Sequence, residues 1–435
     1  MPLAKRTLEL IEEIYPICRS ITGNGVRETL ARVGRQIPVE VHEVASGTRM
    51  FDWTVPPEWN IRDAYIADST GRRIVDFKRN NLHVMSYSVP IRARMRLEAL
   101  RPHLHSLPDR PDWIPHRTSY YQENWGFCLS HRQLESLPDD EYEVIIDSEL
   151  KPGALTYGEY RIPGASSEEF ILFTHTCHPS LCNDNASGIA LLATLAGELA
   201  KQKPRLSYRF VFAPTTIGSI VWLARNGNAI SSIRAGLVVG LVGDAAALTY
   251  KRSRRGDTEV DRIAIQVLRE IDPTSRSIDF TPLGYDERQF CSPGFNLPVG
   301  RLTRSVNGGY PEYHTSADDL GLMRTEALAE SLLAVSRILA RVDANRRFLN
   351  LNPQCEPRLG DRGLLGNLGG GVTRTEMEQA MLWLLNQSDG RHGISDIAAA
   401  SGLSPETLDS AAIGLVGADL LREMGPAPDH SRGVG

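Results

Sequence analysis

The stretch Phe170-Ile-Leu-Phe-Thr-His-Thr-Cys-His-Pro-Ser-Leu-Cys-Asn-Asp-Asn-Ala-Ser-Gly188 decides the fold of this chain. Its apolar residues 170–173 predict a buried strand, which leads into two histidines, His175 and His178. A short loop then contains Asp184, and the apolar run after Gly188 begins a helix. Open α/β sheets bind ligands at the carboxyl ends of their strands, and imidazole with carboxylate is a typical zinc ligand set. The stretch therefore predicts either a metal site or a strand–turn–helix whose histidines satisfy backbone groups.

The rhythm of strand and helix continues along the chain. Further strands are predicted at 142–147, 208–213 and 236–242, with helices at 187–202, 217–226, 259–271 and 325–345. A helical region at 6–33, broken at Gly23-Asn24-Gly25, and a strand at 38–44 come before them. This alternation predicts an α/β protein with a mostly parallel sheet and helices on both faces.

Two regions differ in character from the α/β pattern. Residues 49–135 are rich in proline, tryptophan, tyrosine and short alternating runs, which predicts an inserted β-rich domain. After a glycine-rich linker at 360–371, a helix at 375–386 and a helix–turn–helix from Ile394 resemble a winged helix. The predicted domains are therefore a large α/β domain (1–48 and 136–352), the insert (49–135), and the linker with the winged helix (353–435).

Composition excludes several classes of function. The chain has 435 residues, is 41% hydrophobic and carries a net charge of −5 without long runs of one sign, so neither nucleic acid nor a membrane is an expected partner. No apolar run approaches the ~20 residues of a membrane helix, and the N-terminus lacks a signal-peptide core. Six scattered cysteines without a Cys-x-x-Cys pair favour a reduced, cytoplasmic protein. Cys177 and Cys182 flank the histidines, where small buried residues are favoured over soft metal ligands.

Three later stretches carry further candidates. Asp244 follows the predicted strand 236–242, and the loop Gly284-Tyr-Asp-Glu-Arg contains Asp286, Glu287 and Arg288. The stretch Tyr310-Pro-Glu-Tyr-His-Thr contains Glu312 and His314, and Asp318 or Asp319 is expected to cap a helix. Each residue alone has an ordinary structural explanation, so the information lies in their joint order.

In that order the chain resembles the zinc aminopeptidase superfamily of co-catalytic exopeptidases. The shared pattern is a strand-end histidine, Asp-x-Ala-Ser-Gly, a strand-end aspartate and Tyr-His-Thr, and it covers residues 1–45 and 140–345. The whole chain is more similar still to a bacterial aminopeptidase-like family that has the same insert and C-terminal winged helix. The marks of that family are Phe51-Asp-Trp-Thr-Val-Pro, Cys177-His-Pro-Ser, Thr216-Ile-Gly-Ser-Ile and Tyr250-Lys-Arg-Ser-Arg-Arg-Gly.

The resemblance implies a ligand set. Asp184 matches the carboxylate that bridges two metals, and the peptide bond after it is often cis in the superfamily. His178 matches the strand-end histidine ligand, with His175 as the alternative. Asp244 matches a second carboxylate on that metal, and His314 matches the histidine of the other. The implied cofactor is zinc, with one ion held tightly and a second, weaker ion left open.

The departure from the superfamily concerns the reaction. Thr215 and Thr216 stand where the superfamily has Glu-Glu, of which the first is the general base and the second a metal ligand. A threonine hydroxyl is not a base near neutral pH. Glu287 or Glu312 is a candidate replacement base. Arg288 is a candidate fork for a substrate carboxylate, with an ordinary ion pair as the alternative.

These features predict a metal-dependent hydrolase that cuts an amide bond next to a free amine. An acyl transferase or cyclase on the same metal site is the first alternative, because such a reaction does not need a base that activates water. The second alternative is a non-catalytic binding or regulatory protein on a degenerate peptidase fold. The expected partner is a small-molecule or peptide substrate, and a homo-oligomer is left open.

The winged helix leads to a first testable prediction. Residues 373–424 contain three basic and eight acidic side chains, a balance of −5, whereas DNA binding depends on Lys and Arg neutralising phosphates. The full-length protein should therefore show no measurable binding to duplex DNA at ~0.15 M salt in a fluorescence anisotropy titration. A sub-micromolar complex with one DNA sequence would contradict this.

Overall fold

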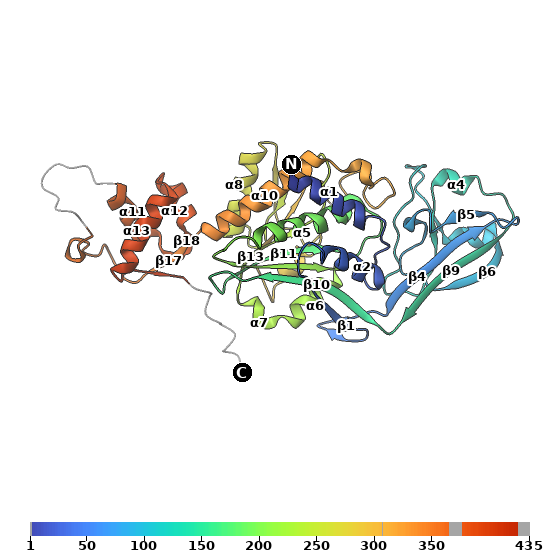
Figure 1. The fold of residues 1–435 in the computed structure, drawn as a ribbon, viewed down its shortest axis with the longest axis horizontal. Coiled ribbons are helices and arrows are strands. Elements are labelled where there is room, and N and C mark those ends of the chain that lie inside the picture. Colours follow the sequence, from blue (N-terminus) through green and yellow to red (C-terminus); the bar gives the residue numbers. More distant parts are fainter. Residues whose placement is uncertain (1, 307, 365–375, 425–435) are drawn as a thin grey trace.

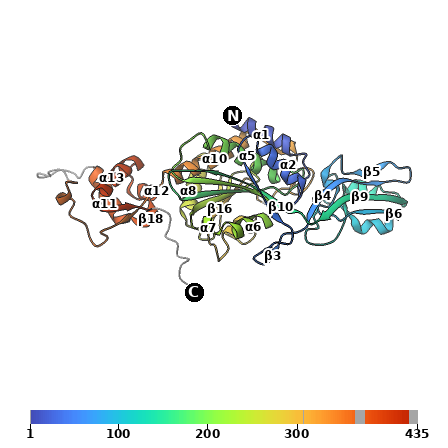
Figure 2. The ribbon, with the colours of Figure 1, turned by 60° about the horizontal axis from the view of Figure 1, so that its bottom comes forward.

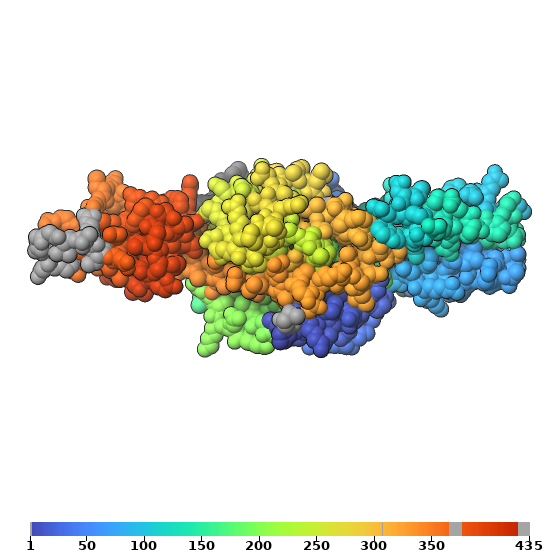
Figure 3. Space-filling model, turned by 90° about the horizontal axis from the view of Figure 1, so that it is seen from above, coloured from blue at the N-terminus to red at the C-terminus, as the bar shows by residue number. Residues whose placement is uncertain are grey.

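The computed structural model describes residues 2–306, 308–364 and 376–424. The molecule is elongated, with three parts in a row (Figure 1 and Figure 3). A large α/β part lies in the middle, the β-rich part lies at one end and the C-terminal helical part lies at the other. No helix in these described ranges is both long enough and apolar enough to cross a membrane.

The central part is built on a sheet of eight strands. Their order across the sheet is β1 (Glu40–Ala45), β10 (Ala154–Ile162), β12 (Ser207–Ala213), β11 (Glu169–His175), β13 (Ile233–Val239), β16 (Val299–Thr303), β14 (Thr249–Lys251) and β15 (Arg276–Ile278). The four strands β12, β11, β13 and β16 run parallel to one another. β1 and β10 on one side, and β14 on the other, pair antiparallel with their inner neighbours. The predicted α/β class with a mostly parallel sheet is confirmed.

β11 shows how the sequence organises the layers. Its side chains are buried on both faces, and they divide strictly by parity. Phe170 and Leu172 join the core under one helical layer, whereas Ile171 and Phe173 join the core on the opposite face. A central parallel strand is covered on both faces, which is why its sequence reads as a continuous apolar run.

Helices cover both faces of the sheet (Figure 2). One layer contains α1 (Pro2–Ile14), α2 (Asn24–Val33), α5 (Gly188–Leu199), α8 (Glu259–Ile271) and α10 (Thr325–Ala344). The other face carries α6 (Ile217–Arg225), α7 (Gly227–Ile230) and the short α9 (Glu287–Phe290). The helices predicted at 187–202, 217–226, 259–271 and 325–345 all form with small shifts at their ends.

The inserted part has its own antiparallel sheet. The strand order is β5 (Arg73–Asp76), β4 (Glu58–Ala67), β9 (Glu141–Lys151) and β6 (Ile91–Arg96). Smaller elements surround it: β2 (Arg49–Met50), β3 (Trp53–Thr54), α3 (Leu97–Leu100), β7 (Leu104–His105), β8 (Phe127–Cys128) and α4 (His131–Glu135). The expectation that 142–147 belongs to the central sheet is wrong, because β9 pairs with β4 and β6 instead. β9 has three consecutive buried residues at 144–146, and such an apolar run is also typical of a central parallel strand, so the sequence pattern does not reveal its partners.

The C-terminal part contains α11 (Glu376–Gln387), α12 (Ile394–Ser401) and α13 (Pro405–Gly417) with a sheet of β18 (Asp389–Gly393), β17 (Arg347–Asn350) and β19 (Leu421–Glu423). β17 lies before the expected boundary at 353, so this part begins earlier in the chain than the sequence suggested. Residues 365–371 of the predicted linker lie outside the described residues.

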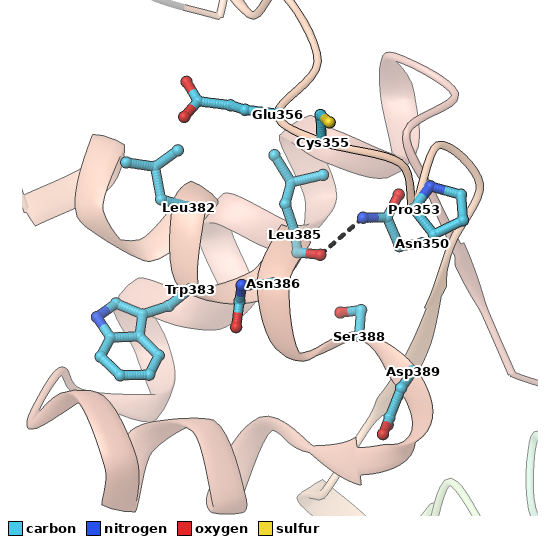
Figure 4. A pocket seen from close by; sticks show the side chains of 10 residues that line it. All are labelled: Asn350, Pro353, Cys355, Glu356, Leu382, Trp383, Leu385, Asn386, Ser388 and Asp389. Atoms are coloured by element: carbon cyan, nitrogen blue, oxygen red, sulfur yellow. Dashed lines mark hydrogen bonds between the residues drawn. The ribbon is translucent and has the colours of Figure 1, made fainter.

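Ion pairs join the C-terminal part to the central part. Arg262 of α8 donates to both oxygens of Asp396 on α12, at 2.8 and 3.0 Å. Arg347 of β17 donates to the buried Glu168 at 2.6 Å. The C-terminal part also has a pocket of its own, of about 590 Å³ (Figure 4). That pocket is lined by none of the site residues predicted from the sequence.

Candidate metal centre

Asp184 lies at the centre of the candidate site. It follows β11 in the turn Cys182–Ser187, its side chain is fully buried, and the Asp184–Asn185 peptide bond is cis, as the family resemblance implies. The Asn185 amide holds the turn in place by donating to the Thr174 hydroxyl at 2.8 Å and to the His175 carbonyl at 3.0 Å. The carboxylate is therefore held on a turn that is tied to the end of the central strand.

Three histidines surround the Asp184 carboxylate. His175 Nε2 lies 2.7 Å from Oδ1, and His314 Nε2 lies 3.0 Å from Oδ2. His178 Nδ1 lies 3.1 Å from Oδ1 but is not aligned for a hydrogen bond, and it has no other partner in the described chain. The Tyr285 hydroxyl donates to Oδ2 at 3.2 Å, and its ring stacks on His175.

Electrostatics favours an ionised Asp184 carboxylate next to a neutral His178 ring. Burial alone would raise the pKa of Asp184, but the charge of His178 and the hydrogen bonds from the histidines outweigh it and hold the pKa well below its usual value. Burial lowers the pKa of His178 to about 4, although Asp184 opposes this shift. An anionic carboxylate with neutral imidazoles is the protonation state that binds a divalent cation.

The ligand atoms are also close enough to share a cation. One atom each from His175, His178 and Asp184 lie within 4.8 Å of one another. The side chain of His314 is 32% exposed, so the cluster reaches solvent on that side. Burial raises the pKa of the Cys177 and Cys182 thiols, so both stay protonated and fit a structural role better than a ligand role. The residues present fit a zinc-type cation held by nitrogen and oxygen.

Asp318 stabilises the turn that carries Asp184 by accepting hydrogen bonds from its backbone. Its two oxygens accept the backbone N–H groups of Asn183 at 2.6 Å and of Asp184 at 3.0 Å. Asp319 caps the 3-10 helix Leu320–Leu322 by accepting from the Gly321 N–H. Of the two carboxylates that the sequence offers as caps, Asp319 is therefore the cap, and Asp318 orients the candidate ligand.

The structure brings together His178, Asp184 and His314, but it places Asp244 apart from them. Asp244 is buried, and its oxygens accept from the Asn183 side-chain amide at 2.6 Å and from the Ala246 N–H at 2.8 Å. Among the described residues, Asp244 has no hydrogen bond or ion pair with the three histidines, and it acts on the turn through Asn183. His175, the alternative ligand from the sequence, has the shortest contact with Asp184.

The residues proposed for catalysis have different surroundings. Glu287 is fully buried and lies 2.8 Å from Lys251 Nζ and 3.5 Å from an Arg301 nitrogen, so two cations already balance its charge. Glu312 is half-buried, and its carbonyl accepts from the N–H and the hydroxyl of Thr315. Arg288 is half-buried, and its Nε has no hydrogen-bond partner among the residues described.

Asp286 lies in the same loop as Glu287 and Arg288, and the sequence gives it no particular role. It is fully buried, one oxygen accepts from the Ser219 hydroxyl at 2.6 Å, and the other oxygen has no partner within the described ranges. Burial raises its pKa to about 6, against hydrogen bonds from Ser219 and Thr215. Asp286 is therefore a buried carboxyl with one unpartnered oxygen among the described residues, and it lies one position before Glu287 in the chain.

The fold is that of the zinc aminopeptidases. The structure of BSAP, a zinc aminopeptidase from Bacillus subtilis, superposes with a TM-score of 0.56, covers 78% of this chain and 95% of that chain, and is 13% identical. A peptidase M28 precursor from Shewanella amazonensis superposes with a TM-score of 0.54, covers 78% and 94% of the two chains, and is 11% identical. At these identities the likeness establishes the fold.

The chain belongs to the family described as "Domain of unknown function (DUF4910)", whose model matches residues 8–345. A winged helix-turn-helix model matches residues 346–423. A Clostridium acetobutylicum protein, named as a candidate polysaccharide biosynthesis protein with an aminopeptidase-like domain, is 52% identical and covers 95% of both chains. The crystal structure of a candidate peptidase from Clostridium acetobutylicum is 50% identical, with a TM-score of 0.83 over 97% of this chain and 96% of that chain.

The support from Asp318 gives a second prediction. Asp318→Ala leaves two buried N–H groups without their acceptor, which should lower the free energy of unfolding by roughly 2–4 kcal/mol in a urea titration. Asp319→Ala is the matched control, because it removes the same charge next door and should cost about 1 kcal/mol or less as a lost cap. Equal losses of unfolding free energy in the two variants would show that the Asp318 carboxylate does not stabilise the turn more than an ordinary cap does.

Proposed function

We propose that this protein is a metal-dependent hydrolase that cuts an amide bond next to a free amine. The observation that carries the proposal is the buried Asp184 carboxylate with imidazole nitrogens of His175, His178 and His314 at 2.7, 3.1 and 3.0 Å. A buried carboxylate without a cation needs hydrogen-bond donors such as these imidazole nitrogens. Imidazole nitrogens and carboxylate oxygens are also the ligand atoms that zinc binds in proteins. The zinc aminopeptidase fold supports the reaction class.

The residues that would hold the cation are Asp184, His175, His178 and His314, with one zinc ion bound tightly and a second more weakly. A bound zinc ion polarises a carbonyl and lowers the pKa of a water molecule. Asp184 supplies the negative charge, and the Tyr285 hydroxyl limits its rotation. The exposed side of His314 is the side from which a substrate would reach these groups.

Proton transfer is the point at which this chain departs from its fold relatives. The ion pairs of Glu287 with Lys251 and Arg301 make it a poor choice for the base. Asp286 is the better choice, since it is buried and one of its oxygens has no hydrogen-bond partner within the described residues. A general base typically contributes ~10²–10⁴-fold to a rate, so a displaced base predicts slow hydrolysis of ordinary substrates.

The second candidate function is acyl transfer on the same centre. The Thr215-Thr216 pair favours it, because an amine acceptor needs less activation than water does. The name of the Clostridium acetobutylicum relative adds polysaccharide biosynthesis as a setting. A substrate screen should therefore include acyl and aminoacyl amides of amino sugars, each with and without an added amine. Product analysis separates the two reactions.

The third prediction concerns metal content. Purified protein reconstituted with Zn²⁺ should retain about one equivalent of zinc after gel filtration. The Asp184→Asn variant should lose the zinc, because its amide lacks the negative charge of the central carboxylate. Asp244→Asn is the matched control and should retain the metal, since Asp244 is engaged by Asn183 and Ala246. Elemental analysis measures all three. Equal metal content in wild type and Asp184→Asn would overturn the centre described above.

The fourth prediction concerns the threonine pair. Thr215→Glu restores a carboxylate at the position where the superfamily has its base, and it should raise aminoacyl-amide hydrolysis by roughly ten-fold or more. Thr215→Gln is the matched control, because it adds the same bulk without the charge and should not raise the rate. Thermal melting of both variants reports on the cost of burying the longer side chain. Equal rates in the Glu and Gln variants would contradict the assignment of Thr215.

A further inference from the structure

The inserted part reaches into the candidate metal centre through one loop. The backbone N–H of His116 donates to the carbonyl of His314 at 2.7 Å, and Pro115 and Thr315 form an antiparallel bridge. On the same stretch, Ser316 N–H donates to the Ile114 carbonyl at 2.8 Å, and Ile114 N–H donates to the Ser316 hydroxyl at 3.0 Å. The insert is therefore joined by backbone contacts to the segment that carries a candidate ligand.

The side chain of His116 is placed among the candidate ligands. It is 6% exposed, and neither ring nitrogen has a hydrogen-bond partner in the part of the chain that the structure describes. Its ring centroid lies 5.5 Å from that of His178 and 5.2 Å from that of His314. A buried polar group without a partner costs about 1–3 kcal/mol, so this position calls for a ligand that the protein atoms do not supply.

The spacing of the rings suits a shared cation. The centroids of His178 and His314 are 4.9 Å apart, so the three rings form a nearly equilateral triangle with His116. When zinc is bound tetrahedrally at about 2.0–2.1 Å from each nitrogen, the centroids of two ligating imidazoles lie about 5 Å apart. The nitrogens of the three rings are not grouped within 4.8 Å of one another, so binding one cation requires the rings to rotate about their side-chain torsions.

We propose that His116 is a cation ligand supplied by the inserted domain, which completes a position formed with His178, His314 and Asp184. This inference rests on the proposed metal-dependent function and adds to it the source of the missing ligand. In the superfamily pattern a glutamate at position 216 serves the metal of the Tyr-His-Thr histidine, and here that position is Thr216. Imidazoles replace the lost carboxylate. A site with three nitrogens and one carboxylate selects Zn²⁺, Co²⁺ or Ni²⁺ over Mg²⁺ or Ca²⁺.

The inference gives the insert a function. A ligand on the insert makes cation binding depend on the position of that domain. His116 reaches the cation only when loop 114–118 is paired with residues 314–316. The insert therefore contributes a ligand to the metal site and is more than an additional domain on the central fold.

The test, which is the fifth prediction, measures cation affinity and ligand geometry in the full-length protein. Zn²⁺ affinity is obtained by competition with a chromophoric chelator, and the visible absorption of Co²⁺-loaded protein reports on the number and type of ligands. His116→Ala should weaken Zn²⁺ binding by at least about ten-fold and should change the Co²⁺ spectrum. His116→Gln keeps most of the side-chain volume and should show the same loss, so a packing defect in the alanine variant does not confuse the result.

His83→Ala is the matched control. His83 is also buried in the insert, but its Nδ1 has a partner of its own in the Cys128 carbonyl, at 2.8 Å. Its replacement should leave the Zn²⁺ affinity and the Co²⁺ spectrum unchanged. Wild-type affinity and spectrum in folded His116→Gln would overturn this inference and leave the metal centre standing. An equal loss in His83→Ala would also overturn it, and a wild-type protein that binds neither ion would overturn the proposed function as well.

Discussion

The structure depends on the burial of one carboxylate, that of Asp184. Removing an ionised carboxylate from water costs several kcal/mol, and the cost is tolerated only with close and well-placed partners. The partners come from separate segments: His175 from the end of β11, His178 from the turn after it, Tyr285 from the loop before α9, and His314 from the loop before α10. The central sheet, by bringing these segments to one end of its strands, makes that burial possible.

The insert and the C-terminal part contact different ends of the central part, and they differ in their relation to the metal centre. The insert contacts the segment around His314, and the C-terminal part contacts the opposite end of the central part through Arg262 and Glu168. Of these two parts, the insert is the one whose described residues contact the segment that carries His314. The acidic winged helix is attached through ion pairs to the central part, which agrees with a packing role for its charges.

Much of the fold is readable from the sequence because its strands and helices repeat with different periods. The continuous apolar run of β11, the order of His178 (with His175 as the alternative), Asp184 and His314, and the winged helix all follow from local pattern or from motif order. The partners of β9 do not, because its buried run at 144–146 resembles that of a central strand although β9 lies in the antiparallel sheet. The sequence does not distinguish the surroundings of Glu287 from those of Asp286, because the two carboxylates are adjacent in the chain, and the contacts of Lys251 and Arg301 with Glu287 are visible only in the folded structure. His116 is a single histidine in a proline-rich loop, and no sequence spacing connects it with the segment around His314, which lies about 200 residues further along the chain.

The central claim is that Asp184 and its histidines bind a cation, and diffraction measures this most directly. Crystals of the protein soaked with Zn²⁺, with data collected on both sides of the zinc absorption edge, should give an anomalous difference peak about 2.0–2.2 Å from Asp184 and from at least two of the histidine rings. A second, weaker peak toward His116 is compatible with this account. A map without a peak within coordination distance of Asp184, in crystals that take up zinc elsewhere, would contradict it.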